Sequence, residues 1–140
     1  MSEFKIDPKL EEDSHLLGNF SFSQLRLINN ALVPWFILVP KTSINEFHCL
    51  PEKDQLTLLG EINMLSGFVS KEFQPDKINI ATIGNIVRQM HVHIIARYRD
   101  DFCWPNVVWG RTAKKTYLTA EVTQIREKIK IHLGPGILAN

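Results

Sequence analysis

Two histidines separated by one residue, His91 and His93, are the side chains of this chain best suited to chemistry. Residues two apart in a strand lie on the same face, so Gln89, His91 and His93 are predicted to form one polar row. The residues between and after them are apolar and are predicted to pack on the core: Met90, Val92 and Ile94. A neutral imidazole is a nucleophile near pH 7, and a partner on its second ring nitrogen fixes its tautomer. The central histidine is therefore suited to attack an electrophile such as phosphorus and to form a phosphohistidine-type intermediate.

The His-x-His spacing is compatible with two other interpretations. Imidazole is a ligand for zinc, copper, iron and nickel, so the pair could hold a metal ion. It could equally be a polar surface row, or a partly buried pair with satisfied hydrogen bonds. His48, Cys49 and Cys103 lack the paired short spacings of a zinc site, and we expect no metal ligand set from them. Spacing alone does not select between catalysis, metal binding and a structural role.

The segments around this row predict the elements that support it. Apolar periodicity predicts helices over residues 9–17, 51–73 and 119–133, with Thr119 as the N-cap of the last. Strands are predicted over residues 21–29, 35–39, 77–83 and 90–96. The first two strands are expected to pair as an antiparallel hairpin through a turn at Asn29 and Asn30. The order predicts an α+β fold with a mainly antiparallel sheet, a long central helix and a C-terminal helix.

The composition is that of a globular protein. The 140 residues, 44% of them hydrophobic and 22% charged, predict a single domain over residues 1–140. A net charge of +1 argues against nucleic acid as a partner. The longest apolar stretch, residues 31–40, is too short to span a bilayer, and residues 1–8 do not resemble a secretory signal. With two cysteines and no membrane partner expected, we predict a cytoplasmic protein with reduced thiols.

Several separated segments resemble the histidine triad (HIT) superfamily of nucleotide hydrolases and transferases. Residues 89–95 read Gln-Met-His-Val-His-Ile-Ile, against the family signature His-φ-His-φ-His-φ-φ, in which φ is apolar. Residues 84–87 resemble the family's Gly-Gln-Ser/Thr-Val, and residues 27–40 resemble its strand, Asn, Pro and second strand. Residues 104–110 are similar to a bacterial subgroup, diadenosine polyphosphate hydrolase-like, whose triad also begins with Gln. The resemblance covers about residues 20–110 and implies a HIT-like fold.

The resemblance implies a role for each matching residue. His91 matches the nucleophile that attacks the α-phosphorus and becomes nucleotidylated. His93 matches the histidine that contacts phosphate oxygens and helps to protonate the leaving group, and its main-chain carbonyl is expected to orient His91. Asn29 matches the asparagine that holds the ribose hydroxyls. Asn85 matches the glutamine that contacts phosphate or the leaving group.

The sequence departs from the family pattern at the first triad position and in the preceding loop. Gln89 replaces the first histidine, and an amide forms hydrogen bonds but does not change its charge near neutral pH. Ile86 replaces the serine or threonine whose hydroxyl reaches the phosphate, and Ala96 replaces a proline. Catalysis at a reduced rate, or on a different leaving group, is compatible with all three changes.

Two further polar residues lie on the strands that carry this resemblance. Asn79 lies between Ile78 and Ile80, which should face the core, so Asn79 faces either the site or solvent. Arg97 follows the row on its polar face. We expect it to form an ion pair with the acidic residues that follow it, rather than to contact substrate.

The sequence therefore predicts an enzyme that hydrolyses or transfers a nucleotide from a dinucleoside polyphosphate or a nucleoside phosphoramidate. No cofactor is expected, although Mg²⁺ could accompany a polyphosphate substrate, and the family resemblance implies a homodimer. One alternative is a non-catalytic nucleotide-binding protein, suggested by Gln89 and Ile86. A less favoured alternative is a metal protein that uses His91 and His93. The motifs name neither the leaving group nor the base.

Overall fold

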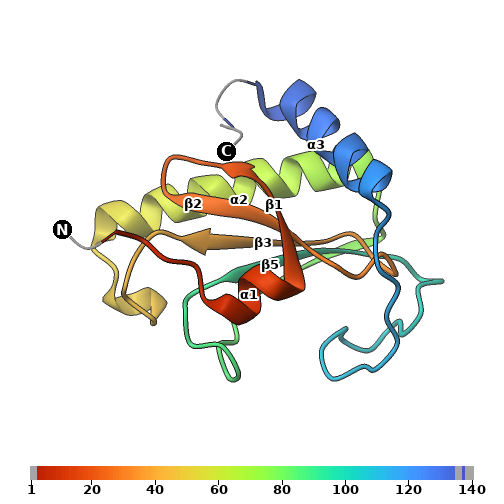
Figure 1. Ribbon diagram of the computed structural model, residues 1–140, viewed down its shortest axis with the longest axis horizontal. Helices are drawn as coiled ribbons and strands as arrows, with labels where there is room; N and C mark the ends of the chain where they lie inside the picture. Colours follow the sequence, from red (N-terminus) through yellow and green to blue (C-terminus); the bar gives the residue numbers. More distant parts are fainter. Residues whose placement is uncertain (1–2, 135–136, 138–140) are drawn as a thin grey trace.

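The computed structural model describes residues 3–134 and residue 137. Its helices are α1 (Pro8–Asp13), α2 (Glu52–Phe73) and α3 (Thr119–Leu133), with a short 3₁₀ turn at Phe47–Cys49. Its strands are β1 (Ser14–Asn19), β2 (Ser23–Ile28), β3 (Trp35–Pro40), β4 (Lys77–Ala81) and β5 (Val92–Arg97). In the described residues these strands form one antiparallel sheet in the order β1-β2-β3-β5-β4, and α2 and α3 lie together on one side of it (Figure 1). The predicted α+β class is confirmed.

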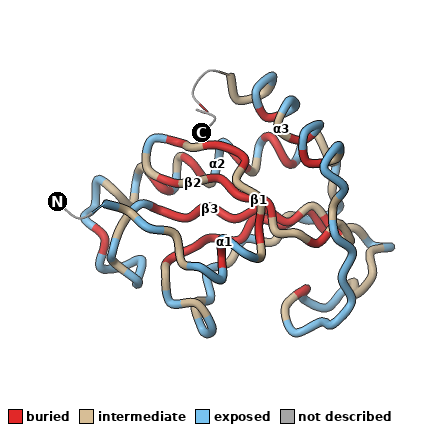
Figure 2. The backbone as a smooth tube through the Cα atoms, in the orientation of Figure 1, coloured by how far each residue is buried: buried red, intermediate tan, exposed pale blue. Residues whose placement is uncertain are grey.

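The middle strand β3 is buried along its whole length, because both faces of the sheet are covered (Figure 2). Its side chains alternate between two hydrophobic clusters. Phe36 and Leu38 join the cluster beneath α2 and α3. Trp35 and Ile37 join a second cluster on the opposite face, where α1 and the connection after β5 pack. This second face is the one that carries the odd-numbered residues of β5.

The hairpin of β2 and β3 was predicted, and its register pairs Leu25 with Leu38 and Leu27 with Phe36. The positions of α2 and α3 also agree with the apolar periodicity, within a residue at each end. The N-cap of α3 is corrected: it is Leu118, not Thr119. The Glu121 carboxylate accepts the Leu118 backbone N–H at 2.8 Å, so an acidic side chain from inside the helix performs the capping.

The prediction of a helix over residues 9–17 was wrong in its second half. The helix ends at Asp13, and Ser14 begins β1, which pairs with β2. The buried Arg26 guanidinium on β2 donates to Ser14 Oγ at 2.7 Å, which joins the two strands where β1 starts. The pairing register shifts between Leu16 and Gly18, and this irregularity removes the strict alternation by which a strand is recognised in sequence.

A buried ion pair holds the connection that follows β5, as expected for Arg97. The Arg97 guanidinium donates to both oxygens of Asp101, at 2.8 and 3.1 Å, and the two side chains are 2% and 3% exposed. Burial alone would raise the pKa of Asp101, but Arg97 and the backbone N–H groups of Tyr98 and Cys103 hold that pKa at about 2. The pair fixes the connection that carries Trp109 towards the cavity described next.

Candidate active site

A cavity of about 350 Å³ lies at the beginning of β5, and both histidines of the row line it. Its walls come from α1, from the end of β2, from the loop between β4 and β5, and from the connection after β5. The lining residues are Lys9, Leu10, Asp13, Ile28, Ile83, Gly84, Asn85, Ile86, Val87, His91, His93 and Trp109. His91 and His93 are 7% and 6% exposed, and their ring centroids lie 4.9 Å apart. Two imidazoles are therefore held next to each other at the wall of a mainly apolar hollow.

His91 is oriented by a backbone carbonyl. Its Nδ1 lies 2.7 Å from the carbonyl oxygen of Gln89, and a carbonyl accepts hydrogen bonds only, so Nδ1 carries the proton. In the neutral ring, Nε2 then holds the lone pair. The expectation that the His93 carbonyl would play this part was wrong, since the carbonyl within hydrogen-bond distance of His91 Nδ1 is that of Gln89. The resulting tautomer is the one that a nucleophilic imidazole needs.

His93 is held in the opposite tautomer by an indole. Trp35 on β3 donates its Nε1–H to His93 Nδ1 at 2.9 Å, so the proton of the neutral His93 ring lies on Nε2. Trp109 packs edge-on against the same ring, with centroids 5.1 Å apart. Burial first, and the neighbouring His91 second, lower the pKa of His93 from 6.5 to about 3. His93 is therefore a neutral hydrogen-bond donor at physiological pH.

This neutral state of His93 should make the fold sensitive to acid. The unfolded chain takes up a proton on this ring below about pH 6.5, whereas the folded protein does so only near pH 3. The stability that depends on the neutral ring is complete above pH 6.5 and is lost progressively as the pH falls towards 3. Urea denaturation should show a free energy of unfolding about 2 kcal/mol lower at pH 5 than at pH 7 because of this group.

The variant His93→Gln supplies the control for this prediction. Its side-chain oxygen can accept from Trp35 Nε1 but does not titrate. Its stability should therefore change much less between pH 7 and pH 5 than that of the wild type. Equal losses in both proteins would show that another group causes the acid sensitivity.

The structure places the other predicted site residues in different surroundings. Asn85 lines the cavity with the two histidines. Asn29 lies at the end of the β2 hairpin strand, where its Oδ1 accepts the backbone N–H of Tyr117 at 3.0 Å. Asn79 on β4 accepts from Arg97 at 2.9 Å and lines a separate hollow beside Val107. Of the three asparagines, only Asn85 lines the cavity, while Asn29 and Asn79 use their amide oxygens to hold other segments.

The side chain of Gln89 was expected to share the row with the histidines, and it does not line their cavity. Its amide forms hydrogen bonds with the backbone of the N-terminal segment, at Lys5 and Asp7. Residue 89 precedes β5, so the two-residue alternation of a strand does not govern the direction of its side chain. Only its carbonyl, through His91, takes part in the candidate site.

Sequence reasoning missed the contribution of α1. Lys9, Leu10 and Asp13 line the cavity, and Lys9 Nζ forms an ion pair with Asp13 at 2.9 Å. Nothing in the local pattern of residues 8–13 indicates this position, because it depends on the pairing of β1 with β2. Trp109 packs against the second cluster and also lines the cavity.

In residues 3–134 and 137, no group of three or more His, Cys, Asp or Glu side chains is arranged to hold a metal ion. Both histidine Nδ1 atoms have hydrogen-bond partners, so two Nε2 atoms are what the pair could offer to a metal. A protein zinc site uses three or four ligands. The described helices include none that is long and apolar enough to cross a membrane.

Comparisons with known proteins find relatives that match this chain over most of its length. The HIT domain family model matches residues 9–100. A histidine triad protein from Sinorhizobium meliloti is 38% identical, over 92% of this chain and 96% of that one, with a TM-score of 0.89. A histidine triad protein from Marinobacter aquaeolei is 36% identical, over 94% of this chain and 97% of that one, with a TM-score of 0.90. No curated protein matches the chain.

The fold and the site define a class: an α+β domain whose antiparallel sheet carries His93 on β5, with His91 just before that strand, beside a glycine-containing loop. The family match covers most of the chain, and the solved structures match it over nearly their whole length. The chain belongs to the HIT domain family. The family and the fold expected from the residues around His91 are thereby confirmed.

Proposed function

We propose that the protein hydrolyses or transfers nucleotides through a covalent nucleotidyl-histidine. Nε2 of His91 attacks the α-phosphorus, a P–N bond forms, and the bond from phosphorus to the leaving group breaks with its electron pair. Water, or another acceptor, then attacks the same phosphorus and releases the nucleoside monophosphate and the free imidazole. The observation that carries this proposal is the hydrogen bond from His91 Nδ1–H to the Gln89 carbonyl, which leaves the basic nitrogen free in a residue that lines the cavity.

The surroundings of His91 support particular roles for its neighbours. The Nε2–H of neutral His93 is suited to donate to a phosphate oxygen, since Trp35 occupies Nδ1. Asn85 is suited to contact the phosphate or the leaving group from the loop before Gln89. Asn29 keeps its amide nitrogen for a ribose hydroxyl while its oxygen holds Tyr117. Gln89 acts through its backbone. Asn79 is left out of the proposed site because it lines a separate hollow and its amide oxygen accepts from Arg97.

The protonation of the site favours one class of leaving group. His93 has a pKa of about 3 and Gln89 carries an amide, so neither supplies a full proton near neutral pH. A phosphate or polyphosphate leaves without one, whereas an amine leaving group must be protonated. We therefore place the dinucleoside polyphosphates ahead of the phosphoramidates as substrates, in agreement with the proposed subgroup that resembles diadenosine polyphosphate hydrolases.

A substrate panel tests this function directly. The protein is incubated with diadenosine polyphosphates and with adenosine phosphoramidates, and the released AMP is measured. In a second measurement the covalent adduct is trapped without the use of acid. We expect AMP release from the polyphosphates, and an adduct whose mass equals the protein plus one adenylyl group. The reaction is run with Mg²⁺ and with a chelator, because we propose the ion only as a counter-ion of the substrate. No AMP release from any member would contradict the proposal.

A non-catalytic nucleotide-binding role is the second candidate. It is favoured by the loop residue Ile86, which is 88% exposed where the family places a hydroxyl, and by the Gln89 side chain, which lies outside the cavity. Equilibrium binding of AMP, combined with no turnover across the panel, would support this candidate over the enzyme.

We also propose a homodimer in the cytoplasm. β4 is an edge strand of the sheet, and the side chain of its Ile80 is 51% exposed. An exposed apolar side chain on an edge strand is typical of a surface that pairs with a second chain. Light scattering coupled to gel filtration should give a mass twice that of one chain. In the variant Ile80→Lys, the measured mass should fall towards that of one chain. A wild type with the mass of one chain at assay concentration would contradict the dimer.

The free thiols Cys49 and Cys103 suit a reducing compartment such as the proposed cytoplasm.

A further inference from the structure

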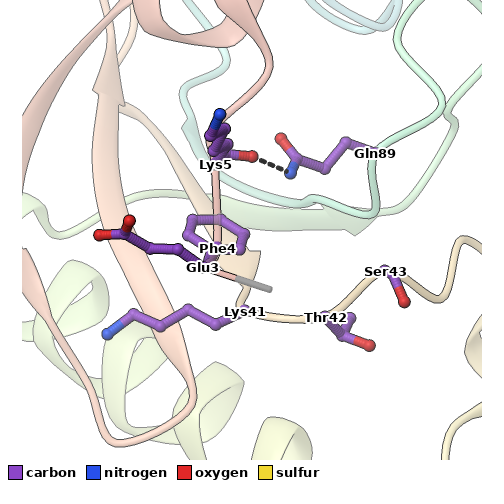
Figure 3. A pocket seen from close by; sticks show the side chains of 7 residues that line it. All are labelled: Glu3, Phe4, Lys5, Lys41, Thr42, Ser43 and Gln89. Carbon is purple, nitrogen blue, oxygen red and sulfur yellow. Dashed lines mark hydrogen bonds between the residues drawn. The ribbon is translucent and has the colours of Figure 1, made fainter. Parts of the chain in front are cut away.

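Both the oxygen and the nitrogen of the Gln89 side-chain amide form hydrogen bonds with the N-terminal segment. Its Oε1 accepts the backbone N–H of Asp7 at 2.8 Å, and its Nε2 donates to the backbone carbonyl of Lys5 at 2.9 Å. Figure 3 shows the second bond, at the edge of a hollow of about 290 Å³ between residues 3–5 and 41–43. A single amide thus joins two backbone groups that lie more than eighty residues away in the sequence.

The segment that Gln89 holds leads directly into one wall of the histidine cavity. Asp7 is the N-cap of α1, and its carboxylate accepts the backbone N–H of Lys9 at 2.8 Å. The helix then supplies Lys9, Leu10 and Asp13 to the cavity lining. The position of this wall therefore depends on where residues 5–7 are fixed.

The same residue also orients the nucleophile, since the Gln89 carbonyl accepts from His91 Nδ1. The side chain of residue 89 thus acts on the segment that leads to α1, and its backbone acts on His91, and both α1 and His91 line one cavity. We propose that Gln89 is a positioning residue: its amide fixes the N-terminal segment so that α1 keeps its place in the wall of the cavity that His91 lines. The kinetic part of this proposal rests on the proposed function.

The chemistry of the contact explains why an amide suits this position. The two partners are one N–H and one carbonyl, so the side chain must accept one hydrogen bond and donate another. Of the planar polar side chains of this length, a carboxylate accepts but does not donate when ionised. The glutamine that stands in place of the family's first histidine therefore has a structural role in this chain, which is to bind the N-terminal segment.

Hydrogen exchange tests the contact without reference to any reaction. In Gln89→Ala, the amides of residues 9–13 should exchange at least about fivefold faster than in the wild type, because two hydrogen bonds to the preceding segment are lost. Gln89→Glu keeps the acceptor and loses the donor, and its exchange should lie between the two. Exchange in Gln89→Ala equal to that of the wild type would overturn the proposal.

Asp7 provides a matched pair of variants on the other side of the contact. Its φ is −59°, close to the fixed value of proline, so Asp7→Pro removes the N–H while this angle is kept. Asp7→Ala removes the capping carboxylate but keeps the N–H, and it is the control. The amides of residues 9–13 should exchange faster in Asp7→Pro than in Asp7→Ala. This difference between the two variants should vanish when each also carries Gln89→Ala. A difference of the same size in both backgrounds would contradict the contact.

Kinetics separate positioning from direct chemistry. In Gln89→Ala the KM for a diadenosine polyphosphate, and the Kd for AMP, should rise roughly tenfold, while kcat stays within about twofold. A fall in kcat that depends on the leaving group would instead assign the amide to the phosphate and overturn the proposal. If the wild type binds AMP without turnover, or does neither, the proposed function fails, and the exchange experiments still decide whether Gln89 holds the segment.

Discussion

Replacing His91 by Asn should lower the rate of AMP release from the best dinucleotide by roughly 10⁴-fold, as expected when a covalent nucleophile is removed. The Asn side chain can donate its Nδ2–H to the Gln89 carbonyl, as His91 Nδ1–H does, so the local backbone should be retained. It offers no basic nitrogen at the position of Nε2. The measurement is the initial rate of AMP release, together with the mass of any covalent adduct.

Binding provides the control for this variant. His91→Asn should bind AMP within a few-fold of the wild type, and it should form no adenylyl adduct, because the cavity walls other than position 91 are unchanged. Turnover that survives the substitution at the wild-type rate would remove His91 from the proposed role. Turnover at the wild-type rate in His91→Asn with an adduct elsewhere would identify a different nucleophile.

Breaking the buried ion pair after β5 should produce the largest loss of stability. Asp101→Ala leaves Arg97 buried without its carboxylate, and it also removes the acceptor for the backbone N–H groups of Tyr98, Cys103 and Trp104. Removing one partner of a buried pair costs about 3–5 kcal/mol, because an uncompensated charge remains. Urea denaturation at pH 7 should show a decrease of this size in the free energy of unfolding.

The neighbouring acidic residue is a matched control for Asp101. Asp100 is exposed, and Asp100→Ala should change the free energy of unfolding by no more than about 0.5 kcal/mol. Equal effects of the two substitutions would show that net charge in this loop, rather than the buried contact, determines stability.

Much of the fold could be predicted from the sequence because its strongest signals are local. The apolar spacing of α2 and the buried run of β3 each contain enough information to identify the element. β1 was missed because its pairing is irregular between Leu16 and Gly18, and because the residues just before it form a helix. Strand formation there depends on β2, which is a long-range partner that local spacing does not reveal.

The candidate site shows the same division between local and long-range information. The two-residue repeat predicted that His91 and His93 lie together, and both line the cavity although β5 begins only at Val92. Val92 and Ile94 belong to apolar clusters, as the repeat also predicted. The predicted direction of the Gln89 side chain was wrong, because the hydrogen-bond partners of this side chain, Lys5 and Asp7, lie at the far end of the chain. The contribution of α1 to the cavity was missed for the same reason.

The indole that donates to His93 gives the protein a built-in optical probe. Trp35 is 9% exposed, and its ring centroid lies 6.0 Å from that of Trp109, which lines the cavity, so these two of the three tryptophans share surroundings with His91 and His93. Emission from such a pair depends on what displaces water beside it. Ligand docking can therefore be followed by intrinsic fluorescence, without any attached dye, in the same sample that is used for catalysis.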